Sequence, residues 1–482
     1  MKKISRITGK NIDMTEGPLF GKIILFVLPM MATNLLQTAY NAADMMIVSI
    51  SPEVNAVGAI GMTTAFINMV LNLFIGFSVG ANVVIARHIG AKNSVAASKV
   101  VHTSLLLAVI LGLSGTAIGI LISRPILALM GAEGNLLDLA TTYTNLYFAG
   151  APFIALTNYA GSIFRAKGDT KTPLYVLTAS GLANVLMNLF FVIVCGLSVE
   201  GVALATSLSN VISASLLLIC LYRSDDICRF DPKKLRIDRQ SLRDVVRMGL
   251  PAGIQSALFS FSNIMIQSSV LRVNNILAPS SSYEPVVEGN AAVANLNGFI
   301  YTATNSIYQT TVAFTSQNVG AGKYDRIKKV LLNSYAITVI IAIVSSALII
   351  VLNRPLLALY GIREGEGIYG IAYESAMKRI RCETTTYFLL ALMEVGCGVL
   401  RGLGKSITAT IISLLGACLL RIVWLLTVFE HFETLESIYL SYPVSWLVTG
   451  AAAFAVVLSI LKKQSVMPKK EPTADLDAVA TG

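Results

Sequence analysis

The sequence contains few charged residues. Asp, Glu, Lys and Arg together make up 13% of its 482 residues, about half of the share in an average soluble domain. Apolar residues make up 55%, and they gather in stretches of about 20 or more residues that are long enough to cross ~30 Å of hydrocarbon as helices. These stretches are continuous rather than alternating, which favours helices over a β-barrel. The composition predicts an all-α membrane protein.

Residues with catalytic or metal-binding chemistry are also sparse. The six cysteines form no close-spaced metal or redox pair, and the three histidines are isolated. The cysteines are best explained as small buried apolar side chains. The sequence has no phosphate-binding glycine loop, no Ser-His-Asp pattern and no metalloprotease motif. We therefore expect neither an enzyme nor a cofactor, since a membrane-embedded enzyme would need a cluster of catalytic polar residues near one interface.

Twelve apolar stretches are long enough to span a membrane. We expect helices over residues 22–50, 57–85, 99–123, 139–164, 174–195, 199–222, 246–271, 291–319, 328–352, 379–400, 407–429 and 437–461. No secretory signal is expected, because the segment before the first stretch is polar and basic and that stretch is too long for a signal peptide.

The two halves of the chain repeat one another. Residues 124–131, Arg-Pro-Ile-Leu-Ala-Leu-Met-Gly, return 230 positions later at 354–361 as Arg-Pro-Leu-Leu-Ala-Leu-Tyr-Gly. Shorter matches occur in the same order: Leu28-Pro29 with Leu250-Pro251, Gly90-Ala91 with Gly320-Ala321, and 164–169 with 400–405. A duplicated membrane protein of this kind is typical of two lobes around a central site. Six spans per half return the chain to its starting side, which predicts two pseudo-symmetric six-helix lobes related as a parallel repeat.

Positive charge is concentrated in alternate loops. The net charge of +10 comes largely from basic residues before the first span, after even-numbered spans, and between spans 6 and 7. Positive loops stay in the cytoplasm, so we expect a multi-pass cell-membrane protein with both termini inside and no nucleic-acid partner. The expected division is a cytoplasmic segment at 1–21, an N-lobe at 22–222, a cytoplasmic linker at 223–245, a C-lobe at 246–461 and a disordered cytoplasmic tail at 462–482.

The first span carries one acidic residue on a polar face. The face consists of Asn34, Gln37, Asn41 and Asp44, at steps of three, four and three, with Tyr40 beside them. Because a carboxylate inside an apolar span is costly, Asp44 should face the bundle interior or a water-filled cavity. The favoured interpretation is a proton or cation site, and the alternative is a structural hydrogen bond near the outer end of the span.

Spans 5 and 6 add uncharged oxygen ligands. Asn184 and Asn188 lie four residues apart on one face of span 5, and Thr206 lies in span 6. Amide and hydroxyl oxygens suit Na⁺ but cannot release a proton at physiological pH. Paired asparagines in a span are also common as hydrogen-bond contacts between helices, and the residues alone leave both interpretations open.

The seventh span repeats the polar face of the first without its acid. Its polar residues are Ser256, Ser260, Asn263 and Gln267. Asn263 falls where Asn41 does in the repeat, but Ile266 occupies the position of Asp44. We therefore expect ion coupling mainly in the N-lobe.

The C-lobe spans contain a second pair of charged residues, Glu394 in span 10 and Arg421 in span 11. An unpaired arginine inside a span is expensive. Arg421 is therefore expected either to neutralise an acid, with Glu394 as one candidate, or to extend to the outer interface beside Trp424. We treat the two residues as a secondary charged site.

Several of these segments resemble the multidrug and toxic compound extrusion (MATE) family. The resemblance rests on 14–19, on Leu28-Pro29 with 34–37, on 76–81 with 90–92, on 164–169 and on 400–404, and it covers about 15–461. The motifs are individually loose and jointly specific. The family implies twelve helices in two six-helix lobes that form a V, and export of organic cations in exchange for H⁺ or Na⁺.

The resemblance also implies roles for single residues. The family's span 1 acid falls on Asp44, its span 5 pair on Asn184 and Asn188, and its span 6 threonine on Thr206. Asn188 departs from the pattern, because related members often have Asp there. The coupling ion therefore stays open, and the four residues are metal ligands only if the ion is Na⁺. Glu394 resembles an acid on span 10 that some members use.

These observations together predict a secondary active multidrug exporter. We expect a monomer in contact with membrane lipid that moves organic cations or amphiphiles. The polar residues of spans 1 and 7 are expected to line its substrate cavity: Asn34, Gln37, Tyr40, Asn41, Ser256, Ser260, Asn263 and Gln267. The alternative is a flippase of the same superfamily for lipid-linked oligosaccharides, which a strongly cationic central cavity would favour.

Overall fold

The computed structural model describes residues 11–50, 53, 55–279 and 284–466, and all regular secondary structure within these ranges is helical. The amino-terminal half contains α1 (Leu19–Val48), α2 (Ala56–Gly90), α3 (Ser94–Leu129), α4 (Gly134–Ala149), α5 (Ala151–Lys167), α6 (Lys171–Leu189) and α7 (Val199–Tyr222). The carboxy-terminal half contains α8 (Arg239–Leu277), α9 (Pro285–Gly320), α10 (Tyr324–Val351), α11 (Asn353–Ala358), α12 (Gly367–Cys382), α13 (Tyr387–Gly402), α14 (Ser406–Ser413), α15 (Leu420–Trp424), α16 (Glu430–Phe432) and α17 (Leu435–Val466).

These helices form twelve membrane spans within the described part of the chain. Eight helical segments there are long and apolar enough to cross a membrane by length and composition alone. The other four spans are α8, α9, α4 with α5, and α12 with α13. They are more polar because they carry side chains that face the protein interior; α9 alone buries Thr304, Ser306, Thr310, Thr311, Thr315, Ser316, Gln317 and Asn318. The predicted fold class, an all-α membrane protein of two six-helix lobes, is confirmed.

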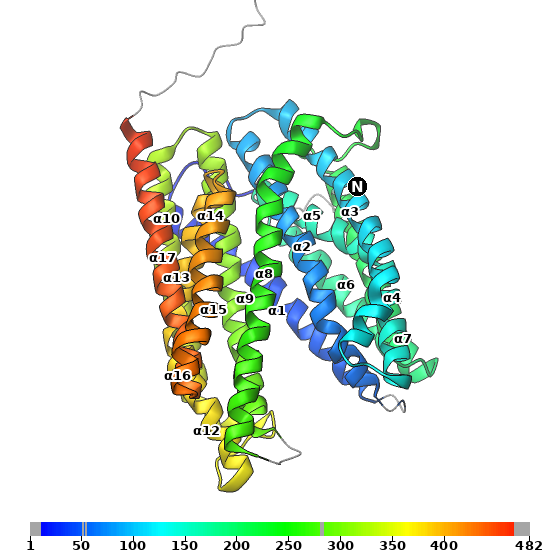
Figure 1. Cartoon of the computed structure of the whole chain (residues 1–482). Helices are drawn as coiled ribbons and strands as arrows, with labels where there is room; N and C mark the ends of the chain where they lie inside the picture. Colours follow the sequence, from blue (N-terminus) through cyan, green and yellow to red (C-terminus); the bar gives the residue numbers. More distant parts are fainter. Residues whose placement is uncertain (1–10, 51–52, 54, 280–283, 467–482) are drawn as a thin grey trace, which may run out of the picture.

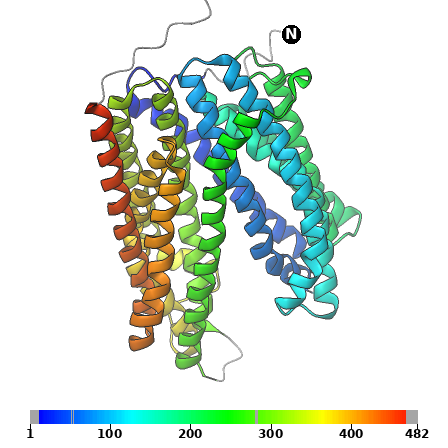
Figure 2. The same ribbon diagram turned by 45° about the horizontal axis from the view of Figure 1, so that its top comes forward.

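The two halves form separate bundles that meet at one end. Figures 1 and 2 show α1–α7 and α8–α17 joined at the top of the molecule, where α17 ends, and diverging toward the bottom. The contact between them is made chiefly by α2 against α8 and α9. Glycines permit the close approach of α2 and α8, because a Cβ at Gly80 would lie only 2.3 Å from the carbonyl oxygen of Val245.

Some helix boundaries differ from the sequence prediction. The span expected at 139–164 is interrupted at Gly150, where α5 restarts with Pro152 near its N-terminus. A Cβ at Gly150 would lie 2.7 Å from the Ser207 hydroxyl oxygen, so α7 packs directly against this break. Residues 353–378, expected to be a loop, form α11 and most of α12.

Helices extend into two of the segments that were expected to lie outside the spans. The linker expected at 223–245 includes the start of α8, which begins at Arg239 because the Asp238 carboxylate accepts a hydrogen bond from the backbone N–H of Ser241. At the carboxyl end, α17 continues to Val466, and the rest of the expected tail, like residues 1–10, lies outside the described residues.

Residues 11–18, here called the N-terminal strap, connect the two halves where they meet. The backbone N–H of Ile12 donates to the carbonyl of Gly168 at 3.0 Å, which attaches the strap to the end of α5. The Asn318 amide of α9 donates to the carbonyl of Met14 at 3.0 Å. The Met14 side chain is fully buried, in a cluster with Phe314. The strap is therefore part of the contact that holds this end of the molecule together.

Candidate functional site

Asp44 lies on a cavity inside the amino-terminal bundle. The cavity has a volume of about 310 Å³, and residues of α1, α2, α4, α5, α6 and α7 line it. Only 9% of the Asp44 surface is exposed. The position agrees with the expectation that a carboxylate in an apolar span faces the protein interior.

Two of the three polar residues predicted around Asp44 hydrogen-bond to it, and the third, Asn184, bonds to one of these two. The Asn188 amide donates to Asp44 Oδ1 at 2.5 Å, and the Thr206 hydroxyl donates to Asp44 Oδ2 at 3.4 Å. The same Asn188 amide nitrogen lies 3.3 Å from Asn184 Oδ1. The structure thus brings together four residues from α1, α6 and α7, although they are up to 162 positions apart in sequence.

The chemistry of this cluster suits one small cation. Asp44 supplies the only carboxylate among the four side chains, and the others supply neutral oxygens. Asn188 Oδ1 is buried and has no hydrogen-bond partner among the described residues. Such an oxygen is costly unless a proton donor or cation reaches it. The cluster can therefore accept a proton on Asp44, or a Na⁺ between Asp44 and the neutral oxygens.

Close packing of α1 against α6 holds the polar face of α1 in place. The Tyr40 hydroxyl donates to the carbonyl of Thr178 at 3.4 Å, and the Tyr40 ring lies directly over Gly181. A Cβ at Gly181 would lie 1.9 Å from the Tyr40 ring, so only glycine fits there. Tyr40, Asn41 and Gln37 all line the cavity that contains Asp44.

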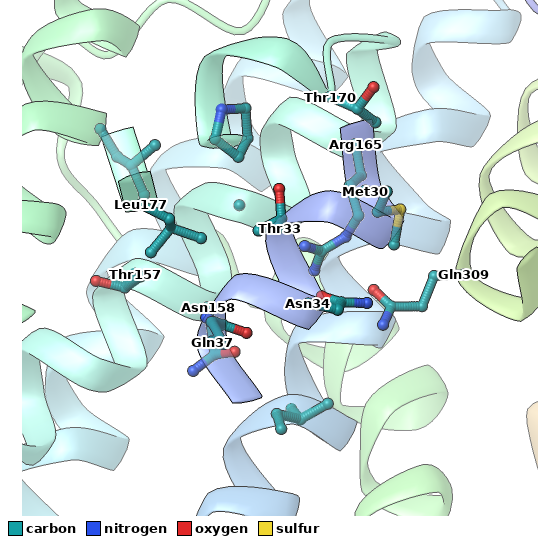
Figure 3. A pocket seen from close by; sticks show the side chains of 14 residues that line it. Met30, Thr33, Asn34, Gln37, Thr157, Asn158, Arg165, Thr170, Leu177 and Gln309 are labelled. Carbon is teal, nitrogen blue, oxygen red and sulfur yellow. The ribbon is translucent and has the colours of Figure 1, made fainter. Parts of the chain in front are cut away.

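A smaller cavity of about 110 Å³ lies further along α1, toward the joined end of the two halves. Asn34 and Gln37 line it together with Arg165 of α5 and Gln309 of α9, as Figure 3 shows. The Asn34 amide also donates to the Ser306 hydroxyl of α9 at 2.9 Å. The polar face of α1 therefore runs from the Asp44 cluster to a contact with the opposite half.

The predicted polar residues of the seventh span lie in the other half. Ser256, Ser260 and Asn263 line a cavity of about 340 Å³, here called the C-lobe cavity. Its other lining residues come from α8, α9, α13, α15, α17 and the segments after α12 and α14, and α2 of the other half contributes Asn72. Gln267 is not among its lining residues, because its side-chain oxygen accepts a hydrogen bond from Asn290 at 3.1 Å. The predicted cavity residues are thus distributed over three cavities rather than one.

Glu394 and Arg421 both line the C-lobe cavity. Among the described residues no direct ion pair joins them. Arg421 instead donates through Nε to the Ser445 hydroxyl at 2.9 Å and lies 4.4 Å from the centre of the Tyr442 ring. Arg421 does not extend to the outer interface either, since it is 7% exposed.

Charged residues inside the protein that were not predicted as site residues include the half-buried Arg165 and three buried ones. Arg165 was counted with the basic loops, yet its guanidinium lies inside the bundle and donates to Ser162 at 2.6 Å. Its repeat equivalent, Arg401, is buried, so the repeat itself carried the missing signal. Arg379 and Glu383 form a buried ion pair at 2.5 Å, which their spacing of four residues could have indicated.

The fold is that of a multi-pass helical membrane protein with internal cavities. The sequence model of the MatE family matches residues 29–190 and 251–426. The chain belongs to the MatE family. The Probable multidrug resistance protein YoeA of Bacillus subtilis is 27% identical over 458 residues, which cover 92% of this chain and 94% of that protein.

Other relatives and solved structures agree with this assignment. The Multidrug export protein MepA of Staphylococcus aureus is 26% identical over 265 residues, which cover 55% of this chain and 59% of that protein. A multidrug resistance MATE family transporter in an outward-facing conformation has a TM-score of 0.86, with 21% identity over 95% of this chain and all of that one. A MOP superfamily transporter from Pyrococcus furiosus has the same TM-score with 22% identity and equal coverage. The recognition from sequence is confirmed.

Proposed function

We propose that this protein exports organic cations and other aromatic or amphiphilic compounds in exchange for H⁺ or Na⁺ at Asp44. The observation that carries the proposal is the cluster of Asp44 with Asn184, Asn188 and Thr206 on an internal cavity. The names of YoeA and MepA, which describe multidrug resistance and multidrug export, support the substrate class.

The coupling follows from the cost of a buried charge. An unpaired carboxylate inside the bundle is unfavourable, and a proton or Na⁺ removes much of that cost. Occupancy of Asp44 changes the hydrogen bonds that α1 makes with α6 and α7, and α1 also contacts α9 through Asn34 and Ser306. An ion at Asp44 therefore acts on the helix that connects the cavity to the other half.

The arrangement of the halves corresponds to the outward-facing state if both termini lie in the cytoplasm. The halves are joined at the end with the N-terminal strap and diverge at the other (Figure 1). The basic loops support this orientation in the cell membrane. A membrane potential of about 100 mV then contributes about 2.3 kcal/mol for each net charge that crosses.

Efflux of a fluorescent organic cation from proteoliposomes tests the proposal. We expect an imposed H⁺ or Na⁺ gradient to drive transport of the fluorescent cation against its own concentration gradient. A gradient of one of the two ions should be sufficient for this transport. Asp44→Asn should abolish the coupled component at unchanged expression, and Thr178→Ala serves as a control that leaves the Asp44 cluster intact, because Tyr40 contacts only the backbone carbonyl of residue 178. Undiminished coupled transport by Asp44→Asn would contradict the assignment.

A further inference from the structure

The C-lobe cavity contains an arginine whose hydrogen-bonding capacity is mostly unused. Arg421 is buried, with only 7% of its surface exposed. Of the five N–H groups of a guanidinium, the hydrogen bonds within the described residues use one, from Nε to Ser445. The guanidinium is stacked 4.4 Å from the ring centre of Tyr442 and 5.7 Å from that of Trp446, at the wall of the cavity. Its terminal nitrogens are thus held in a fixed orientation with donors to spare.

The neighbouring acids are already occupied by other arginines. Glu383 interacts electrostatically with Arg421, but its Oε2 accepts a hydrogen bond at 2.5 Å from Arg379 Nε. Arg379 is further fixed by Nη1, which donates to the backbone carbonyl and the side-chain oxygen of Asn290 at 2.9 and 2.6 Å. The Arg379–Glu383 pair is therefore complete without Arg421.

Glu394, the second acid of the cavity, has Arg401 as a counter-charge without a direct ion pair among the described residues. Arg401 interacts electrostatically with Glu394, and it is held by hydrogen bonds to the Gln255 side-chain oxygen at 2.7 Å and to the Tyr308 hydroxyl. Three arginines, at 379, 401 and 421, thus face two glutamates, at 383 and 394, in the interior of this half. One positive charge is left over. Among the described residues, Arg401 and Arg421 form no direct ion pair, and Arg421 makes a single hydrogen bond, whereas Arg401 makes two.

Part of the cavity wall is apolar and aromatic. Tyr387, Leu390, Met393, Tyr442 and Trp446 line it, and its volume of about 340 Å³ lies within the range of small-molecule sites. A buried positive charge without a partner is unfavourable, whereas a planar carboxylate can accept two parallel hydrogen bonds from a guanidinium. An aromatic ring attached to that carboxylate would find stacking surfaces beside it.

We propose that Arg421 binds the carboxylate of aromatic compounds that the C-lobe cavity accepts as transport substrates. This inference rests on the proposed export function, and it assigns opposite charge preferences to the two halves. Within the described part of the chain, the Asp44 cavity has one carboxylate and no basic residue at its wall. The C-lobe cavity has Arg421 together with Glu383 and Glu394, and Arg379 and Arg401 lie behind these two acids as counter-charges. The protein therefore handles zwitterionic and anionic aromatic compounds in addition to organic cations.

Binding can be measured without transport, because one of the two tryptophans lies in the cavity. The sequence contains two tryptophans, and Trp446 lines the cavity while Trp424 does not. In solubilised Trp424→Phe protein, we expect naphthoate to change the Trp446 fluorescence in a saturable manner. The uncharged naphthamide should require a concentration about ten-fold higher, since a charge-assisted bidentate contact is absent. Equal binding of the two compounds, or no response to naphthoate, would refute the assignment.

Variants of Arg421 separate its charge from its packing. Arg421→Gln in the same background should remove the preference for naphthoate over naphthamide, and Arg421→Lys should keep part of it because the charge remains. The comparison of naphthoate with naphthamide in the parent protein decides the proposal even if Arg421→Gln does not fold.

Transport distinguishes this inference from the proposed function. The probes are a zwitterionic rhodamine with a free carboxylate and its methyl ester. We expect the unmodified protein to export both dyes. In Arg421→Gln, export of the carboxylate dye should fall about ten-fold, whereas export of the methyl ester should be unchanged. Export of the ester alone by the unmodified protein would refute only the role of Arg421. Retained naphthoate binding with no ion-coupled export of either dye would refute the exporter function and leave the binding site.

Discussion

Gly90 of α2 and Gly320 of α9 are equivalent residues of the sequence repeat, and each lies against the backbone of the other's helix. A Cβ at Gly90 would lie 2.0 Å from the carbonyl oxygen of Gln317, and a Cβ at Gly320 would lie 1.9 Å from that of Arg87. Arg87 and Gln317 are themselves equivalent, each three residues before its glycine. The joined end of the two halves is therefore a nearly two-fold symmetric contact that requires glycine on both sides.

We expect Gly90→Ala to weaken this contact and open the joined end. The measurement is maleimide labelling of a single cysteine placed at Ala166, a fully buried residue whose carbonyl accepts a hydrogen bond from Gln317. Labelling in a cysteine-free background should become several-fold faster. Gly298→Ala is the matched control on α9, because nothing lies within 4 Å of a Cβ there. Equal labelling rates in both variants would argue against a role for Gly90 in closure.

The two hydrogen bonds to Asp44 differ in length and should differ in effect. Asn188→Ala removes the 2.5 Å contact, and Thr206→Ala removes the 3.4 Å contact. A hydrogen bond to a charged group contributes about 1.5–3 kcal/mol and favours the ionised carboxylate. If the ion is H⁺, Asn188→Ala should therefore lower the H⁺ concentration for half-maximal transport at least about ten-fold. If the ion is Na⁺, loss of the Asn188 oxygen as a ligand should instead raise the Na⁺ concentration required. Thr206→Ala should have a clearly smaller effect. The reverse order in a titration of H⁺ and Na⁺ would show that the hydrogen-bond lengths do not rank the contributions.

The Tyr40–Gly181 contact predicts a non-additive pair of substitutions. Gly181→Ala should lower the thermal stability of the solubilised protein, because the new methyl group overlaps the Tyr40 ring, and overpacking of this kind costs about 1–3 kcal/mol. Tyr40→Ala in the same chain should restore much of the loss, since it removes the overlapping ring. Additive losses in the double variant would show that the two residues act independently.

An ion pair outside the membrane predicts a pH-dependent stability. Lys167, at the end of α5, lies 2.8 Å from Asp226 of the segment between α7 and α8. Burial alone would raise the pKa of Asp226, but the Lys167 ammonium and hydrogen bonds from Lys167, Ser224 and the Cys228 backbone outweigh it and hold that pKa below its ordinary value. A carboxylate with a lowered pKa stabilises the folded state above the unfolded pKa of about 4, and this stabilisation is lost as the pH falls further.

The measurement compares Asp226→Asn with Asp225→Asn, which changes an exposed neighbour. At neutral pH, Asp226→Asn should lower the thermal midpoint, because it leaves the Lys167 ammonium buried without its partner. The deficit relative to the unmodified protein should shrink below about pH 4, where Asp226 itself becomes protonated. A deficit that is independent of pH would mean that the ion pair does not contribute.

The sequence was sufficient for the spans and for the Asp44 cluster, for different reasons. The twelve apolar stretches are long and nearly free of charge, so their number was clear, although their ends moved and the stretch at 139–164 is interrupted at Gly150. The asparagines at 184 and 188 share a helical face at a spacing of four residues. Their distance from Asp44 depended on how α6 packs on α1, and only the family resemblance carried that information.

The interior of the other half was harder to predict. Helical spacing places Glu394 on one face of α13 and Arg421 on one face of α15. It does not predict which hydrogen-bond or ionic partners the packing of α12 and α17 brings to these two side chains. Those two helices bring Glu383 and Ser445 to the cavity, and the first of them was expected to lie mostly in a loop. Arg165 was missed because basic residues at the end of a span usually lie in loops, whereas the side chain turns back into the bundle.

The N-terminal strap imposes an order on assembly. Met14 is among the first described residues of the chain, yet the amide that holds its carbonyl belongs to a residue 304 positions later. During synthesis, Ile12 of the strap can already bond to Gly168, but the Met14 carbonyl has no partner until α9 has been made and inserted. The seal between the halves is completed late in biogenesis, and a truncated chain that ends before α9 leaves Met14 without the pocket that buries it.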